Sequence, residues 1–218
     1  LANQCDYLVV GESIAGGTTT ALAVLMAQGY DAANKVSSTL PVNPHDLKLQ
    51  TAKEGLGRTK FTPEQMKRDA LTAVAAVGDP MMPAAAGIIV GAARKVPVIM
   101  AGGTQMAAVL SIVKNLEPRV LGNIAIGTTR WILNDKSADL VGLVKQIAPV
   151  PVLAANLDFS TSHIDGLKVY ETGLVKEGVG CGGATIATIC RSQGDVDAHI
   201  MLMRIEASYK RIMMYAKK

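Results

Sequence analysis

The chain has 218 residues, of which 49% are hydrophobic and 18% charged, so it can bury a substantial core and disorder is excluded. A net charge of +4 suits phosphate-bearing ligands, but only 4% of the residues are aromatic and no Lys/Arg run is present, so nucleic acid is not an expected partner. No apolar run reaches the roughly 18 residues that a membrane span requires, and we expect no membrane partner.

The three cysteines are Cys5, Cys181 and Cys190, an odd number that lacks CxxC spacing. This pattern favours neither a disulfide framework nor a zinc site, and it is typical of a protein in the reducing cytoplasm. The three histidines do not share ligand spacing either. We therefore expect a cytoplasmic protein without a metal centre.

A short apolar run at residues 6–10 predicts a buried parallel strand, and a glycine- and threonine-rich loop over residues 11–20 follows it. Residues 21–26 then predict a helix. This order is typical of phosphate-binding sites, because loop amides and a helix N-terminus attract anions. The loop matches neither G-x-G-x-x-G nor the P-loop pattern, and no lysine follows its glycines, so the spacing does not predict a dinucleotide or a nucleoside triphosphate. A plain connection is the alternative.

Capping signals and helical periodicity mark the middle of the chain. Thr62 and Gln65 form a capping box that opens a helix expected to run to residue 77. Asp79 with Pro80 can then cap a helix that continues to residue 95. Further helices are expected over residues 44–57, 105–115, 136–147 (capped by Asp135) and 195–218, and residues 30–43 should form a long loop.

Three more apolar runs, at residues 96–100, 120–126 and 150–155, predict strands. Small polar residues follow each of them, as they follow the first. Because the carboxyl ends of parallel strands line the ligand crevice of an open α/β sheet, the agreement among four loops indicates a site there. We predict an α/β fold, with a three-layer, mostly parallel Rossmann-like sheet, helices on both faces and a single domain over residues 1–218.

A second glycine-rich stretch, residues 178–183, has four glycines in six positions and directly follows Glu177. Such a cluster permits positive φ or close approach of the backbone to a ligand, and the apolar run at 184–190 predicts a helix that these glycines open. Glu177 would then lie at a ligand. The alternative, which this stretch alone does not exclude, is a helix cap in which Glu177 only answers the helix dipole.

In their order, residues 11–19, 96–103, 160–163 and 175–180 resemble nicotinate-nucleotide:dimethylbenzimidazole phosphoribosyltransferase, and more narrowly its archaeal relatives. The motifs differ in detail.

The family loop reads Gly-Glu-Met-Gly-Ile-Gly-Asn-Thr-Thr, whereas Ile14 here replaces a glycine and Gly17 replaces the asparagine. Ala101 stands where the family tends to have Asp, and Lys176 where it tends to have Gly. These differences leave open which base accepts the phosphoribose.

The resemblance implies transfer of phosphoribose from nicotinate mononucleotide to a benzimidazole-type base, giving α-ribazole phosphate and nicotinate for the lower ligand of cobamides such as cobalamin. Glu177 is similar to the family's general base. Neither a cofactor nor a metal is implied, because the leaving pyridinium is already cationic. The implied substrate-binding residues are Glu12, Ser13, Gly16, Gly17, Thr18, Thr19, Gly102, Gly103, Thr104, Gly127, Thr128, Ser160, Ser162 and Gly178.

Two other classes remain as alternatives, a dinucleotide-binding Rossmann-like domain and a noncatalytic binding domain. Because the chain begins at Leu1, close to a first strand, we expect it to be the C-terminal part of a longer chain. It should then bind the nucleotide better than it catalyses. The family's habit and the long C-terminal helix favour a homodimer.

Overall fold

The computed structural model describes residues 2–174 and 180–216. Its central element is a four-stranded sheet in the order β1-β2-β3-β4, and each neighbouring pair is parallel. In the register, Val98 lies between Leu8 and Ile124, and Ile126 lies opposite Val152. The predicted parallel α/β sheet is therefore confirmed. Its strands are Leu8–Gly11 (β1), Val98–Ala101 (β2), Ile124–Thr129 (β3) and Val152–Ala155 (β4).

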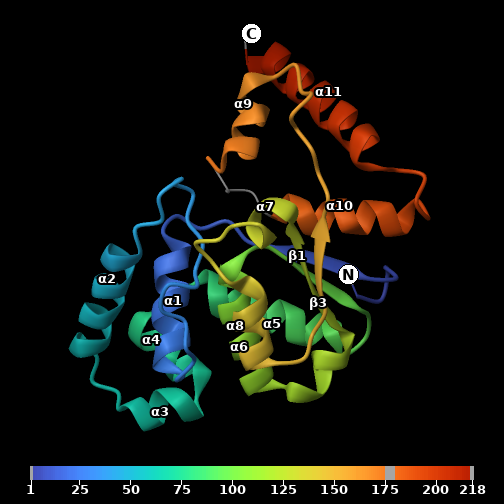
Figure 1. The fold of residues 1–218 in the computed structure, drawn as a ribbon. Coiled ribbons are helices and arrows are strands. Elements are labelled where there is room, and N and C mark those ends of the chain that lie inside the picture. Colours follow the sequence, from blue (N-terminus) through green and yellow to red (C-terminus); the bar gives the residue numbers. More distant parts are fainter. Residues whose placement is uncertain (1, 175–179, 217–218) are drawn as a thin grey trace.

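Helices cover both faces of this sheet, which makes the three layers that the sequence predicts (Figure 1). One helix, α10 (Gly180–Arg191), crosses one face and contacts all four strands. On the other side, α5 (Met81–Ala93) contacts β1 and β2, and α6 (Thr104–Leu116) packs against both α5 and α8 (Leu140–Ile147).

An outer group of helices packs beyond α6. The first of them, α1, contacts α6, α2 and α4. The predicted capping box is present, because Thr62 and Gln65 satisfy each other's backbone amides. The single helix expected from residue 62 to 77 is wrong, since Asp69 takes an extended conformation and its carboxylate caps a new helix by accepting from the amide of Leu71 at 3.0 Å. These helices are α1 (Gly17–Ala27), α2 (His45–Arg58), α3 (Pro63–Arg68) and α4 (Ala70–Val77).

Two other expected boundaries also differ from the structure. The strand expected from residue 120 begins only at Ile124, because Pro118–Asn123 forms a 3-10 helix (η1). The helix expected from residue 136 begins at Leu140, because Asp139 rather than Asp135 is its N-cap and accepts from the amide of Gly142 at 2.7 Å.

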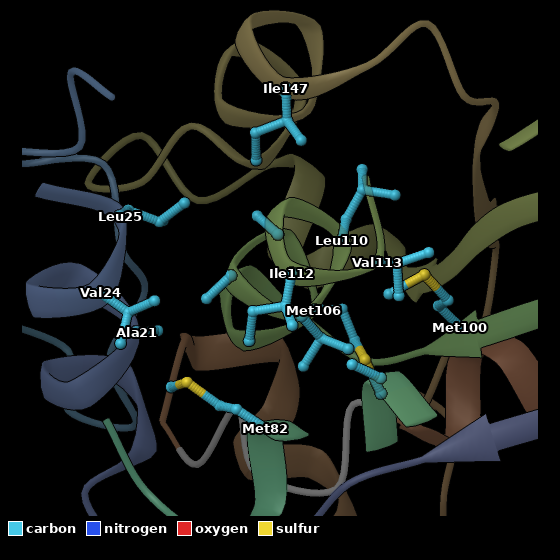
Figure 2. Close-up of a cluster of buried hydrophobic side chains, with 14 of the residues drawn as sticks. Ala21, Val24, Leu25, Met82, Met100, Met106, Leu110, Ile112, Val113 and Ile147 are labelled. Atoms are coloured by element: carbon cyan, nitrogen blue, oxygen red, sulfur yellow. The ribbon is translucent and has the colours of Figure 1, made fainter. Parts of the chain in front are cut away.

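The main core lies between α1, α6 and the sheet (Figure 2). The α1 residues Ala21 and Leu25, the β2 residue Met100 and the α6 residues Met106 and Leu110 are all fully buried. Each fully buried large apolar side chain contributes about 1.5–3 kcal/mol to folding, so this layer fixes α1 and the loop before it against α6.

A smaller core supports the C-terminal part of the chain. Trp131, Phe159 and Tyr170 form an aromatic cluster whose ring centroids lie 4.9–5.7 Å apart. Leu202 packs against this cluster from the long last helix, which begins at residue 198 rather than 195. The elements here are α7 (Arg130–Leu133), α9 (Asp165–Lys168), η2 (Val169–Thr172) and α11 (Ala198–Ala216), and Figure 1 shows α9 and α11 far from α3.

Candidate anion-binding site

The loop that joins β1 to α1 lines a cavity of about 470 Å³ beyond the carboxyl end of the sheet. Three other segments complete its wall: the chain after α1, one side chain of α2 and one of α6. The lining residues are Glu12, Ser13, Ile14, Ala15 and Gly16 from the loop, Gly17, Thr18 and Thr19 from the start of α1, then Ser37, Ser38, Thr39, Leu40, Lys48 and Gln105.

The two glycines that open α1 are needed for different reasons. Gly16 is the N-cap of α1 and has a φ of +72°, which side-chain-bearing residues rarely adopt. A Cβ at Gly17 would lie 2.5 Å from Ile14 Cγ2 and 2.9 Å from Gln105 Nε2. Among the described residues, no side chain caps α1 and no acidic residue lies in its first turn. The amides of Gly17 and Thr19 donate to the carbonyls of Ile14 at 3.4 Å and of Gly16 at 2.9 Å, so the helix N-terminus offers chiefly its positive dipole end to an anion in the cavity.

Lys48 brings a buried cation to the same cavity. Only 6% of the residue is exposed, and its Nζ donates to the carbonyl of Ser37 at 2.5 Å and to Oδ1 of Asn43 at 3.0 Å. These two hydrogen bonds orient the ammonium at the cavity wall. Ser37 is held in turn by Oγ1 of Thr104, which lies 3.0 Å from both the amide and the hydroxyl of Ser37.

Glu12 is the acidic residue among the described residues that line the cavity. Burial raises the pKa of Glu12, and the nearby negative charge of Asp79 raises it further. Nε2 of Gln105 donates to Oε2 of Glu12 at 3.4 Å, a long bond. Glu12 therefore keeps its proton to a higher pH than an exposed glutamate does, and in that form it can donate a hydrogen bond to an anion.

The structure brings six of the predicted substrate-binding residues together in this cavity, and three others lie directly behind it. A Cβ at Gly102 would lie 3.6 Å from Oε1 of Glu12. Gly103 is the N-cap of α6, and Thr104 holds Ser37 as described above. These three therefore support the lining from behind. The six that line it are Glu12, Ser13, Gly16, Gly17, Thr18 and Thr19.

Four other predicted residues do not line the cavity. A Cβ at Gly127 would lie 2.7 Å from the Cα of Gly183, so Gly127 allows α10 to approach β3. Thr128 is fully buried, and its Oγ1 has no hydrogen-bond partner in the described part of the chain. Ser160 is exposed, whereas Ser162 is buried and donates to Oε1 of Glu206 in α11 at 2.6 Å. The role of Ser162 in the structure is thus to fasten α11.

The predicted base Glu177 and the predicted substrate contact Gly178 lie outside the described residues. The helix that follows them, α10, begins at Gly180, where a Cβ would lie 3.4 Å from the carbonyl oxygen of Ala101. The N-terminus of α10 therefore lies over the carboxyl ends of β1 and β2, which is the same end of the sheet as the cavity.

Sequence reasoning missed several lining residues. Residues 30–43 read only as a long loop, although the three consecutive hydroxyl side chains at Ser37, Ser38 and Thr39 were a usable signal. Lys48 and Gln105 carried no such signal, because nothing in the sequence distinguishes either from the other polar residues of its helix. No lysine follows the loop glycines in the sequence, but Lys48 of α2 lines the cavity.

The described residues contain no group of three or more His, Cys, Asp or Glu side chains that could hold a metal ion. Within the same ranges the three cysteines form no disulfide bond; Cys5 and Cys181 are half-buried and Cys190 is exposed. In this part of the chain, no helix combines the length and the apolar character needed to cross a membrane.

The fold and the cavity together define an α/β protein suited to a phosphate-bearing ligand. In agreement with this, residues 1–130 match the family model described as "Phosphoribosyltransferase" (DBI_PRT). The chain belongs to this family, the dimethylbenzimidazole phosphoribosyltransferases. The family resemblance seen in the sequence is thus confirmed.

The chain is also similar to archaeal proteins named UPF0284. The one from Sulfolobus acidocaldarius is 45% identical over 213 residues, which cover 98% of this chain and 59% of the relative. The one from Methanocaldococcus jannaschii is 51% identical over 189 residues, which cover 85% of this chain and 53% of the relative. The chain therefore spans a little more than half the length of these curated relatives.

Proposed function

We propose that this chain transfers phosphoribose from nicotinate mononucleotide to a benzimidazole-type base, giving α-ribazole phosphate and nicotinate for the lower ligand of cobamides. The observation that carries the proposal is the cavity where the first turn of α1 meets Lys48, in a member of a phosphoribosyltransferase family. The reaction would take place in the cytoplasm, on a homodimer.

The phosphate of the nucleotide would occupy the end of the cavity formed by residues 16–19 and Lys48. The hydroxyls of Thr18 and Thr19 and the Lys48 ammonium would donate to its oxygens, and the positive dipole end of α1 would attract its charge. Hydrogen bonds to charged groups contribute about 1.5–3 kcal/mol each, so a few of them hold a phosphate firmly.

The chemical step would join the acceptor base to the anomeric carbon of the bound ribose. A ring nitrogen of the base attacks that carbon, and the bond to the pyridinium nitrogen breaks with its electron pair, which releases neutral-ring nicotinate. Positive charge develops on the acceptor base, and its other ring nitrogen loses a proton to a carboxylate. We assign this general-base role to Glu177, which comes three residues before α10. Thr128 and Ser160 stay candidates for contacts to the two bases.

The test is product formation from nicotinate mononucleotide and 5,6-dimethylbenzimidazole, followed by chromatography of α-ribazole phosphate and nicotinate. The Sulfolobus acidocaldarius relative is assayed in parallel, because this chain spans only part of its length. We expect both proteins to bind the nucleotide and to form one nicotinate for each α-ribazole phosphate. Turnover should be slower for this chain than for the longer relative.

If both proteins bind the nucleotide but neither forms product, the noncatalytic alternative is correct. NAD retained through purification of either protein would instead favour the dinucleotide-binding alternative. Omitting the acceptor base is the control, since the release of nicotinate without it would indicate hydrolysis rather than transfer.

A further inference from the structure

Asp79 joins two helices behind the cavity. One carboxylate oxygen, Oδ1, accepts from the amides of Met81 and Met82 at 3.0 and 3.3 Å and so caps α5. The other, Oδ2, accepts from Oγ1 of Thr20 at 2.5 Å. Thr20 belongs to the first turns of α1, directly after the residues that line the cavity. The first oxygen therefore serves the start of α5, and the second reaches a different helix, α1.

The same carboxylate acts on the cavity through its charge. Among the described residues, Asp79 at the start of α5 is the charge that acts on Glu12, while Lys48 of α2 lines the same cavity and the neutral Gln105 of α6 donates a hydrogen bond to Glu12. The charge of Asp79 favours the protonated form of Glu12. Asp79 thus affects both the position of the α1 N-terminus and the charge state of the acidic side chain that lines the cavity.

We infer that Asp79 is a positioning residue of the anion site: through Thr20 it holds the start of α1 against α5, so that the loop amides and Glu12 meet an anionic ligand in a fixed geometry. This inference rests on the proposed function for the identity of the natural ligand. Asp79 thus belongs to the anion site although it does not line the cavity, and capping α5 does not account for its bond to Thr20.

The first experiment breaks the link without touching the cap. Thr20→Val removes the hydroxyl at nearly constant volume, and Thr20→Ser keeps it. We expect Thr20→Val to weaken the binding of nicotinate mononucleotide in calorimetry by about 2- to 30-fold, the range for residues that act on a site without contacting its ligand. Thr20→Ser should bind within about twofold of the wild type on the same scale.

A matched control exists at the start of α4. Oγ1 of Thr72 donates to Oδ2 of Asp69 at 2.7 Å, so this pair repeats the Thr–Asp bond at a helix start that does not line the cavity. Thr72→Val removes a local bond of the same kind within one helix start, so it should leave nucleotide affinity unchanged. Equal effects of the two variants on affinity would overturn the inference.

The second experiment separates the charge from the cap. Asp79→Asn keeps an N-cap side chain, since Asn caps helices about as well as Asp. Removing the charge lowers the pKa of Glu12, so Glu12 becomes ionised at lower pH and begins to repel a bound anion there. Sulfate is the probe for this experiment, because it does not titrate in the range measured.

We expect the pH at which sulfate binding declines to move downward in Asp79→Asn and to stay in place in Thr20→Val. In a protein that already carries Glu12→Gln, adding Asp79→Asn should leave the pH dependence of sulfate binding unchanged, because the titrating side chain is gone. An unchanged pH profile in Asp79→Asn, with affinity unchanged in Thr20→Val, overturns the inference. If the wild type binds both anions but forms no product, the proposed function fails while the positioning role stands; if it binds neither, both are wrong.

Discussion

The two glycine-rich stretches of this chain look alike in sequence and are used in opposite ways. Around Gly16 the backbone faces open space, since nothing would lie within 4 Å of a Cβ there, and the loop lines a cavity. In α10, by contrast, a Cβ at Gly182 would meet the backbone of Thr128, and one at Gly183 would meet Ala101. The first stretch leaves room for a ligand, whereas the second leaves room for the sheet.

The difference teaches that a glycine cluster marks close approach without saying what approaches. Gly182 and Gly183 lie inside α10 and let it cross the sheet close to β2 and β3. This packing brings the start of α10, at Gly180, to the carboxyl end of the sheet. The second stretch thus contributes to the site by placing a helix, and the first by lining the cavity with its own residues.

The largest effect should come from Glu177, just before the second stretch. Glu177→Gln should lower the turnover of phosphoribosyl transfer by about 10²–10⁴, the typical cost of losing a general base, with only a modest change in KM. Steady-state kinetics and thermal melting on the same protein test this. Wild-type turnover in the variant would leave Glu177 only a helix-capping role.

The next largest effect should be a loss of folding stability when a glycine of the second stretch is replaced. Gly182→Ala places a methyl group on the backbone of Thr128, and overpacking of this kind costs about 1–3 kcal/mol. We expect the upper end of that range, because the atoms in the way are backbone and cannot rotate aside. Chemical denaturation measures it, and a free energy of unfolding equal to that of the wild type would refute the packing role of Gly182.

For the first stretch we expect a loss of binding. Gly16→Val puts a β-branched residue at a φ of +72° and narrows the approach to the α1 amides. Nucleotide binding should weaken by about 1–3 kcal/mol, as polar partners are left unmade. Calorimetry decides the matter, and unchanged affinity would remove this loop from the site.

We expect the smallest effect at Gly87 in α5. Its substitution is the matched control for those in both glycine-rich stretches. A Cβ there would meet nothing within 4 Å, and its φ is not positive. Gly87→Ala should therefore raise the stability of the protein by about 0.5–1 kcal/mol, the helix-propensity difference between the two residues. It should leave nucleotide binding unchanged, and a loss of stability would show that glycine substitutions in this chain are not governed by local space.

Much of the fold could be predicted from the sequence because its signals are local. The apolar runs that became β1, β2 and β4 and the capping box at Thr62 each depend on neighbouring residues. The errors lie where two local signals compete. Val120 continues an apolar run but follows Pro118 into a 3-10 helix, and Asp139 takes the capping role expected of Asp135.

The site was less predictable, because half of it depends on contacts between distant segments. The loop over residues 12–19 carries its own signal, but Lys48 reaches the cavity only through the packing of α2 on α1. Ser162 was predicted to bind a ligand because its hydroxyl follows a strand. In the structure this hydroxyl instead donates a hydrogen bond to Glu206. Such choices between a ligand and a distant side chain cannot be read from residue spacing.

The central claim is that the cavity between the α1 N-terminus and Lys48 holds the phosphate of nicotinate mononucleotide. Calorimetry with this nucleotide and with nicotinate riboside, which lacks the phosphate, tests it most directly on the wild type and on Lys48→Met. We predict that the wild type binds the nucleotide much more tightly than the riboside, and that Lys48→Met weakens nucleotide binding by about 1.5–3 kcal/mol without affecting the riboside. Equal affinity of the wild type for the nucleotide and the riboside would contradict the account.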